Sequence, residues 1–211
     1  MARGEYALAS KDQKTVIRLK LLPVQEAGFD PEVLIRAQAA PSLSGETLAR
    51  ARSAWHLGQF SFEAHDPDVF PALDFLLDLV IRLADRSSGV VADPIARRYL
   101  LPAELAALRI RAPVDARAHM SIGQGGGEVF TQGLQKFALP EFVLAAVNEV
   151  SESAAGAFLL GSAQRVLEGQ VVRSGGRLAS GRAAFEVREA FPRGRWRPRA
   201  RTPPPNRPNG W

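Results

Sequence analysis

Hydrophobic and polar residues alternate in several stretches of this chain, and such alternation is typical of strands with one buried face. The stretches lie at 15–22, 53–65, 113–123 and 128–139. Strict alternation fails near Gly58, so we expect a β-bulge there. A short apolar run at 89–94 predicts another buried strand, and residues 175–191 predict a last one.

Two segments have the apolar period of an amphipathic helix and a good capping residue before it. One runs from Asp66 to Asp85, and its apolar stripe includes Leu73, Leu76, Leu77 and Val80. The other follows Ser151 and is rich in small residues that allow close packing on a sheet. Asp30 predicts the start of a shorter helix. Together the elements predict an α+β fold, a mainly antiparallel sheet with helices packed on one face.

A glycine-rich loop, GQGGGE at Gly123–Glu128, separates two of the alternating stretches. Its position between strands favours a flexible hairpin connection. It lacks the Lys-Ser or Lys-Thr of a phosphate loop and the third glycine of a dinucleotide fingerprint. Backbone N–H groups in such a loop can still cradle an anion, so an anion site remains an alternative.

Composition narrows the possible functions. Apolar residues make up 46% of the 211 residues, enough for a sizeable core. The chain has no cysteine, which excludes disulfides, thiolate metal sites and cysteine nucleophiles. No segment has the roughly 18–20 uncharged apolar residues of a membrane-spanning helix. The alanine- and arginine-rich composition leads us to expect a cytoplasmic bacterial protein.

The charge of the chain is concentrated at its C-terminal end. Residues 193–211 contain six arginines and no acid, so the net charge of +5 leaves residues 1–192 at −1. The prolines keep this stretch extended. We therefore expect a single α+β domain at 1–190 and an extended or disordered arm at 191–211. The arm residues that would contact a partner are Arg193, Arg195, Trp196, Arg197, Arg199, Arg201, Arg207 and Trp211.

Three functions are compatible with this organisation. The first is a non-enzymatic accessory protein that docks on a partner protein through the arm. The second is binding of RNA, DNA or another polyanion, because guanidinium groups bind phosphates and tryptophan stacks on bases. The third is a small hydrolase or ligand-binding domain. An inert, solubilising arm is the remaining alternative for that segment.

Candidate chemistry in the body is sparse. A possible surface site includes Asp93, His119, Thr131 and Lys136. The spacing of the three histidines matches no metal motif, and three acids on one helix face are more typical of a solvated surface. We therefore assign no catalytic residue, no metal and no cofactor.

The segment TQGLQKFALPEF at 131–142 fits the pattern T-x-G-[LM]-x-[KR]-F-x-x-P-[ED], matched at Thr131, Gly133, Leu134, Lys136, Phe137, Pro140 and Glu141. Together with GVVADP at 89–94, it makes residues 50–170 similar to a group of uncharacterised bacterial α+β domains. This resemblance implies a sandwich of ferredoxin-like character and no established activity. From the residues alone, we expect one alternating strand that is interrupted at Gly133 and ended by Pro140.

Overall fold

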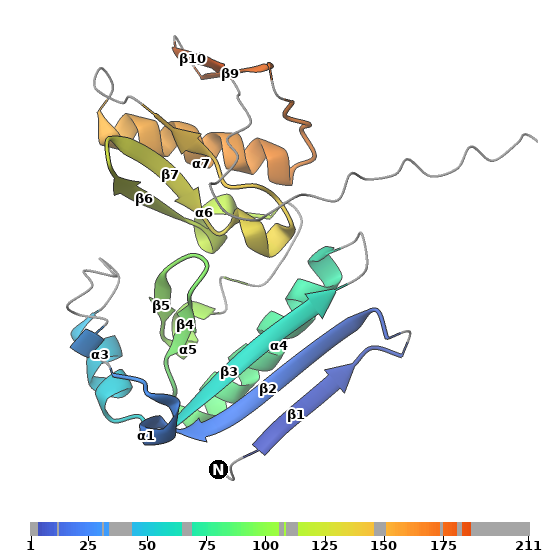
Figure 1. The fold of residues 1–211 in the computed structure, drawn as a ribbon, viewed down its shortest axis with the longest axis vertical. Coiled ribbons are helices and arrows are strands. Elements are labelled where there is room, and N and C mark those ends of the chain that lie inside the picture. The colour runs from blue at the N-terminus through green and yellow to red at the C-terminus, as the bar shows by residue number, and fades with distance from the viewer. Residues whose placement is uncertain are drawn as a thin grey trace, which may run out of the picture. The chain divides into compact units, whose positions relative to one another are not determined.

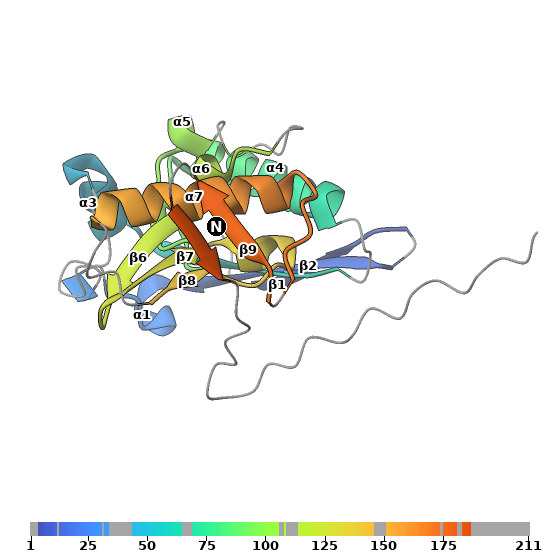
Figure 2. The ribbon, with the colours of Figure 1, turned by 90° about the horizontal axis from the view of Figure 1, so that it is seen from above.

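The fold is described from a computed structural model of the whole chain (Figures 1 and 2). The structure describes residues 4–11, 13–30, 32–33, 44–64, 69–105, 108, 114–145, 151–173, 175–180 and 183–186. The chain divides into two compact units, Met1–Gln170 and Val171–Trp211. The division into a domain at 1–190 and an arm stays a prediction. The predicted arm at 191–211 lies outside the described residues.

An antiparallel sheet of three strands forms the N-terminal part of the first unit. Its strands, in the order β1-β2-β3, are Gly4–Ala9, Thr15–Pro23 and His56–Ala64. β2 and β3 pair continuously over their whole length, so the bulge predicted near Gly58 was wrong. Ile17 and Leu21 are buried on one face, and the exposed ion pair Arg18–Glu63 lies on the other. The sequence did not predict β1.

Short helices connect β2 to β3. They are α1 at Val24–Ala27 and α3 at Gly45–Arg52, and the side chain of Ser44 caps α3 by accepting from the Thr47 N–H. The side chain of Asp30 accepts from the Glu32 N–H, as expected of a cap, while most of the helix predicted after it lies outside the described residues. Trp55 lies just before β3 and is 81% exposed.

The long helix α4, Val69–Ser87, confirms the predicted amphipathic helix, although residues 65–68 lie outside the described residues. It covers one face of the three-stranded sheet (Figures 1 and 2). Arg82 and Asp78, which are one helical turn apart on α4, form an ion pair at 2.7 Å. The apolar stripe of α4 also packs against residues outside this sheet, since Leu73 contacts Val114 and Phe137.

A hairpin follows α4, and it is central to the site described below. Its strands are β4 at Val91–Asp93 and β5 at Arg98–Leu100. The strand predicted in 89–94 is confirmed, but its residues are half-buried or exposed rather than buried. The short helix α5, Pro102–Leu105, follows it. Leu100 and Leu105 join Ile81 of α4 in a buried cluster, which anchors the hairpin to the helix.

A second antiparallel sheet, β6-β7-β8, contains the glycine-rich hairpin. The strands are Ser121–Gly125, Glu128–Gln132 and Val143–Leu144. Gly126 and Gly127 form the two-residue turn, with φ of 63° and 79°, which confirms the predicted hairpin.

Two predictions around this sheet were wrong. Residues 114–120 do not extend β6, because Ala116–His119 form the helical turn α6, capped by the Asp115 side chain. β7 does not continue to 139, because Gly133 turns the chain into the 3-10 helix η2, Leu134–Phe137.

Helix α7, Glu152–Leu167, contacts all three strands of the second sheet. The predicted cap is confirmed, since the Ser151 side chain accepts from the Ala154 N–H. The prediction that small residues allow close packing is also confirmed, because Gly156 lies against Ile122 of β6. The side-chain amide of Gln164 on α7 accepts from the Ala116 N–H and donates to the Val114 carbonyl. These two hydrogen bonds fix the segment before α6.

In the second unit, β9 at Arg177–Ser180 and β10 at Ala183–Glu186 form an antiparallel hairpin where one strand was predicted. The α+β class with antiparallel sheets is therefore confirmed, but the described strands form four small sheets. Among the helices that the structure describes, none combines the length and apolar character needed to cross a bilayer.

Candidate functional site

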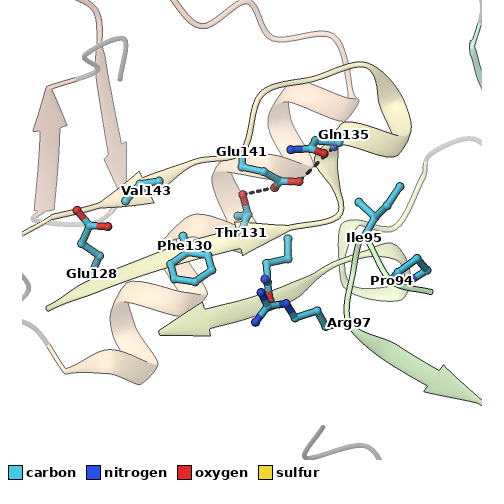
Figure 3. A pocket seen from close by; sticks show the side chains of 10 residues that line it. Pro94, Ile95, Arg97, Glu128, Phe130, Thr131, Gln135, Glu141 and Val143 are labelled. Carbon is cyan, nitrogen blue, oxygen red and sulfur yellow. Dashed lines mark hydrogen bonds between the residues drawn. The ribbon is translucent and has the colours of Figure 1, made fainter. Parts of the chain in front are cut away.

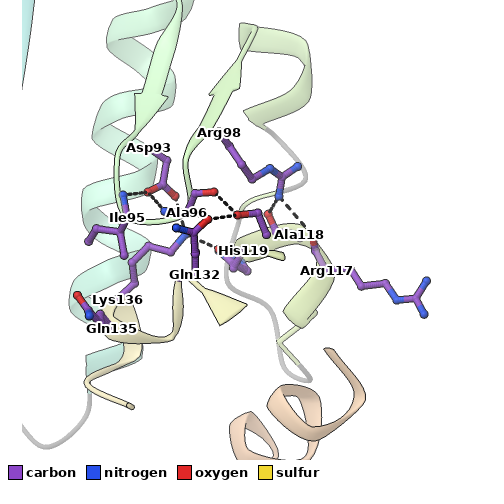
Figure 4. Close-up of polar contacts among 12 residues, drawn as sticks. Asp93, Ile95, Ala96, Arg98, Arg117, Ala118, His119, Gln132, Gln135 and Lys136 are labelled. Carbon is purple, nitrogen blue, oxygen red and sulfur yellow. Dashed lines mark hydrogen bonds and ion pairs between the residues drawn. The ribbon is translucent and has the colours of Figure 1, made fainter. Parts of the chain in front are cut away.

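Three of the four predicted surface-site residues meet where the β4–β5 hairpin touches η2 (Figure 4). Asp93 ends β4, and its Oδ1 accepts from the backbone N–H groups of Ile95 and Ala96 at 3.1 and 3.0 Å. Its Oδ2 accepts from Lys136 Nζ at 2.5 Å. The carboxylate therefore shapes the hairpin turn and ties it to η2 at once.

Lys136 is largely buried rather than exposed. Its side chain is 11% exposed and that of Asp93 is 17% exposed. Besides Asp93, Nζ donates to the backbone carbonyl of His119 at 2.5 Å. Burial lowers the pKa of Lys136, while the charge and hydrogen bond of Asp93 oppose that shift. The ammonium is thus held between a carboxylate and a carbonyl.

His119 reaches this cluster through its backbone, while its ring packs elsewhere. The residue is 2% exposed, and the ring meets Phe137 edge-on with centroids 5.4 Å apart. Burial, followed by the nearby charge of Lys136, lowers the pKa of His119 to about 4. At neutral pH the imidazole is therefore uncharged.

Further hydrogen bonds hold the hairpin to α6 and β6. Arg98 of β5 donates to the backbone carbonyls of Arg117 and Ala118. Ser121 Oγ donates to the Ala96 carbonyl at 2.5 Å. The tip of the hairpin is consequently fixed beside the second sheet.

Thr131 belongs to a second polar network, centred on Glu141 (Figure 3). Its hydroxyl donates to Glu141 Oε2 at 2.7 Å and accepts from the Phe142 N–H at 2.8 Å. Glu141 Oε1 accepts from the N–H groups of Gly133 and Gln135 at 2.8 and 3.2 Å. This carboxylate therefore holds the turn between β7 and η2.

Gly133 makes this turn possible. Its φ of 129° lies in a region that side chains rarely adopt. A Cβ at this position would lie 2.6 Å from the carbonyl oxygen of His119, the atom that accepts from Lys136. The glycine thereby links the two polar networks.

An open groove with a volume of about 530 Å³ lies beside these networks (Figure 3). The turn of the β4–β5 hairpin supplies Pro94, Ile95 and Arg97, and the remaining lining residues are Glu128, Phe130, Thr131, Gln132, Gln135, Glu141 and Val143. Ile95 is 41% exposed and Val143 is 47% exposed. The groove thus has exposed apolar side chains with charged groups among them.

The ring of Phe130 lines the groove. Its position also accounts for the glycine at position 123 of β6. Gly123 is paired with Phe130 across the strands. A Cβ on residue 123 would lie 2.4 Å from the ring of Phe130. The glycine leaves room for the ring against β6.

The structure brings together Asp93, His119 and Lys136, with His119 buried and the other two largely buried, and Thr131 bonds to Glu141 instead. The predicted arm residues lie outside the described residues. Sequence reasoning missed the groove residues Ile95, Arg97, Phe130 and Val143. Phe130 could have been found from the alternation in β7, because neighbouring residues of a strand face opposite sides and Val129 is buried.

The chemistry open to these groups is limited by their partners. The side chains of Asp93, Lys136, Thr131 and Glu141 all make hydrogen bonds within the chain. Within the described part of the chain, no group of three His, Asp or Glu side chains is placed to hold a metal ion. Of the three histidines, His65 lies outside that part. The arrangement suits a rigid binding surface.

No protein-family model, curated protein or solved structure matches this chain.

Proposed function

We propose that this chain is a non-enzymatic interaction protein that binds an extended segment of a partner protein in the groove beside β7. The observation that carries the proposal is the exposure of Ile95 and Val143 on either side of Phe130. Exposed apolar side chains grouped around a groove are typical of binding surfaces.

The rigidity of the groove walls supports binding. The turn that contributes Ile95 is fixed by Asp93 and Lys136, and the wall that contributes Glu141 is fixed by Thr131 and two backbone N–H groups. A preorganised surface loses little conformational entropy when a ligand binds. The same hydrogen bonds occupy the polar groups that a hydrolase would use, so the geometry favours binding over the hydrolase alternative.

The lining indicates the chemistry of the bound segment. Apolar side chains would contact Phe130, Ile95 and Val143, and these contacts would supply most of the affinity. Arg97 and Glu128 add one charge of each sign at the groove. Glu141 already accepts three hydrogen bonds, so its charge is less available to a ligand.

The arginine-rich arm extends this proposal beyond the groove. Its six arginines and two tryptophans give it the chemistry to dock on an acidic partner surface. Binding of a polyanion through the same arginines is the second candidate, because that residue pattern suits phosphates equally well.

Selection of peptides from a random display library on the full chain tests the groove. We expect the selected peptides to share apolar residues. Their affinity for the Ile95→Asp and Val143→Asp variants should be at least tenfold lower than for the unchanged chain. The matched control is Phe75→Asp, because Phe75 is 54% exposed on α4 and remote in sequence from the groove. Selected peptides that bind Ile95→Asp and Val143→Asp as tightly as the unchanged chain would contradict the proposal.

Salt dependence tests the arm. If the arm binds nucleic acid, the logarithm of affinity should fall with the logarithm of salt with a slope of about −4 to −5, as expected for six neutralised phosphates. Replacing Arg193, Arg195, Arg197, Arg199 and Arg201 with alanine should abolish most of that slope. If the arm docks on a protein, Trp196→Ala and Trp211→Ala should weaken binding more than any single arginine change. A labelled oligonucleotide that does not bind at low salt would eliminate the polyanion candidate.

A further inference from the structure

Strand β1 presents an unusually apolar edge. Among the strands that the structure describes, it is one of the two outer strands of the sheet β1-β2-β3. One of its edges pairs with β2, and no described strand pairs with the other. Tyr6 is 50% exposed and Leu8 is 48% exposed. Proteins commonly protect such edges with charges, prolines or bulges, because an open edge pairs readily with another strand. Between Gly4 and Ala9, the only charged residue is Glu5.

The direction of the backbone groups of β1 follows from its pairing with β2. The Ser10 N–H bonds to the Thr15 carbonyl, and Leu8 pairs with Ile17 in the same register. Because the N–H and C=O groups of a strand alternate in direction, those of the even-numbered residues face β2. Those of Glu5, Ala7 and Ala9 therefore face outward.

We propose that β1 pairs antiparallel with β1 of a second copy of this chain, with Ala7 opposite Ala7 on the two-fold axis. In this register Glu5 lies opposite Ala9 of the other copy, so all outward-facing backbone groups are used. The pairing would form about six backbone hydrogen bonds. The two three-stranded sheets would become one sheet of six strands.

The side chains of β1 fit this register. Tyr6 lies opposite Leu8 of the second copy at a non-hydrogen-bonded position, where cross-strand side chains lie closest. Both residues lie on the sheet face of buried Ile17, because Leu8 pairs with Ile17 and Tyr6 pairs with Leu19. Pairing would therefore extend an existing apolar face across the axis. Glu5 meets an alanine, so no like charges oppose each other.

This self-complementarity favours a second copy over an unrelated strand. One short edge buries less area than the roughly 1,200–2,000 Å² of a standard interface, so we expect a dissociation constant on the order of micromolar. The association should depend visibly on concentration. It is independent of the groove and of the arm.

Sedimentation of the full chain over a range of concentrations tests the proposal. We expect a reversible monomer–dimer equilibrium. Tyr6→Lys and Leu8→Lys should each shift it at least tenfold toward monomer, while Phe75→Lys on α4 should leave it unchanged. Ala7→Pro should have the same effect as the lysine variants, because it removes an outward N–H that β2 does not use. A chain that stays monomeric at high concentration would overturn the proposal, as would a dimer that persists in all three edge variants.

Cross-linking tests the register, since the chain has no cysteine of its own. Ala7→Cys should form a covalent homodimer under mild oxidation, because the two sulfurs would meet at the axis. Glu5→Cys alone should not, but a mixture of Glu5→Cys with Ala9→Cys should. Ser61→Cys, exposed in the middle of β3, is the matched control. Equal cross-linking of Ala7→Cys and Ser61→Cys would overturn the register.

Discussion

Gly133 is the single residue on which both polar networks depend. It has a positive φ, and a Cβ would collide with the His119 carbonyl. Gly133→Ala should therefore destabilise the protein by more than about 3 kcal/mol, since backbone strain alone costs 1–3 kcal/mol. Gly156→Ala is the control, because its Cβ would make an ordinary contact of 3.5 Å with Ile122 and helix propensity favours alanine by about 0.5–1 kcal/mol. Urea unfolding measures both, and equal effects would contradict this role of Gly133.

The largely buried pair of Asp93 and Lys136 leads to a second prediction. Removing one member leaves the other charge buried without its partner, so Lys136→Met and Asp93→Asn should each cost about 3–5 kcal/mol. The double variant should cost clearly less than the sum of the two. Glu63→Gln, which removes the exposed partner of Arg18, should cost about 0–1 kcal/mol. Additive losses in a double-mutant cycle by urea unfolding would show that the pair does not act as a unit.

His119 should make stability depend on pH. Its pKa is about 4 in the folded protein and near 6.5 when exposed. At pH values above 6.5 both states are neutral, and the histidine contributes nothing to the pH dependence. As pH falls toward 4, the unfolded state takes up a proton that the folded state excludes. The free energy of unfolding should then decrease by on the order of 3 kcal/mol.

The test of this prediction is unfolding at several pH values for the unchanged chain and for His119→Gln. The variant lacks the titrating group, so its stability should fall less between pH 6.5 and pH 4. The two curves should be parallel at higher pH. Parallel curves over the whole range would mean that His119 titrates normally.

At the scale of elements, α4 links the first sheet to the rest of its unit. Leu73 is 3% exposed and packs on Val114 and Phe137, so Leu73→Ala should cost about 2–5 kcal/mol in unfolding experiments. Phe75 is on the same helix but 54% exposed, and Phe75→Ala should cost less than about 0.5 kcal/mol. A larger loss from the Phe75 change would mean that this side of α4 is covered by a partner.

The sequence predicted those elements whose signals are local. Ser151 caps α7, and Gly126 with Gly127 closes the β6–β7 hairpin, as capping and turn chemistry require. Prediction from the sequence failed where a contact with a residue outside the segment decides the local structure. Alternation over 128–139 favoured one strand, but Glu141 holds the turn at Gly133 that ends β7. Similarly, Gln164 of α7 fixes the segment that forms α6.

The candidate site shows the same division. Asp93 and Lys136 were singled out from the sequence, but no spacing rule brings together two residues that are 43 positions apart. Their burial depends on packing of the hairpin against η2, which periodicity does not reveal. The groove was missed because its lining comes from the hairpin turn, β7, η2, β8 and the segment before β8, each of which contributes only a few side chains.

For the whole molecule, the structure supports a scaffold in which largely buried polar pairs position an open groove with exposed apolar side chains. The arm, the groove and the β1 edge would then provide three separate contacts, to a partner surface, a partner segment and a second copy. Separate contacts of this kind can increase total affinity through effective concentration.

The most direct test of the groove is an NMR titration. A peptide from the display selection is added to isotope-labelled full-length protein, and the amide spectrum is recorded. We predict that the largest changes in amide chemical shift occur in the hairpin turn at 94–97, in β7 and in β8. They should be lost in Val143→Asp and retained in Phe75→Asp. Changes confined to β1–β3 or to residues 191–211, with none along β7, would contradict the groove as the binding site.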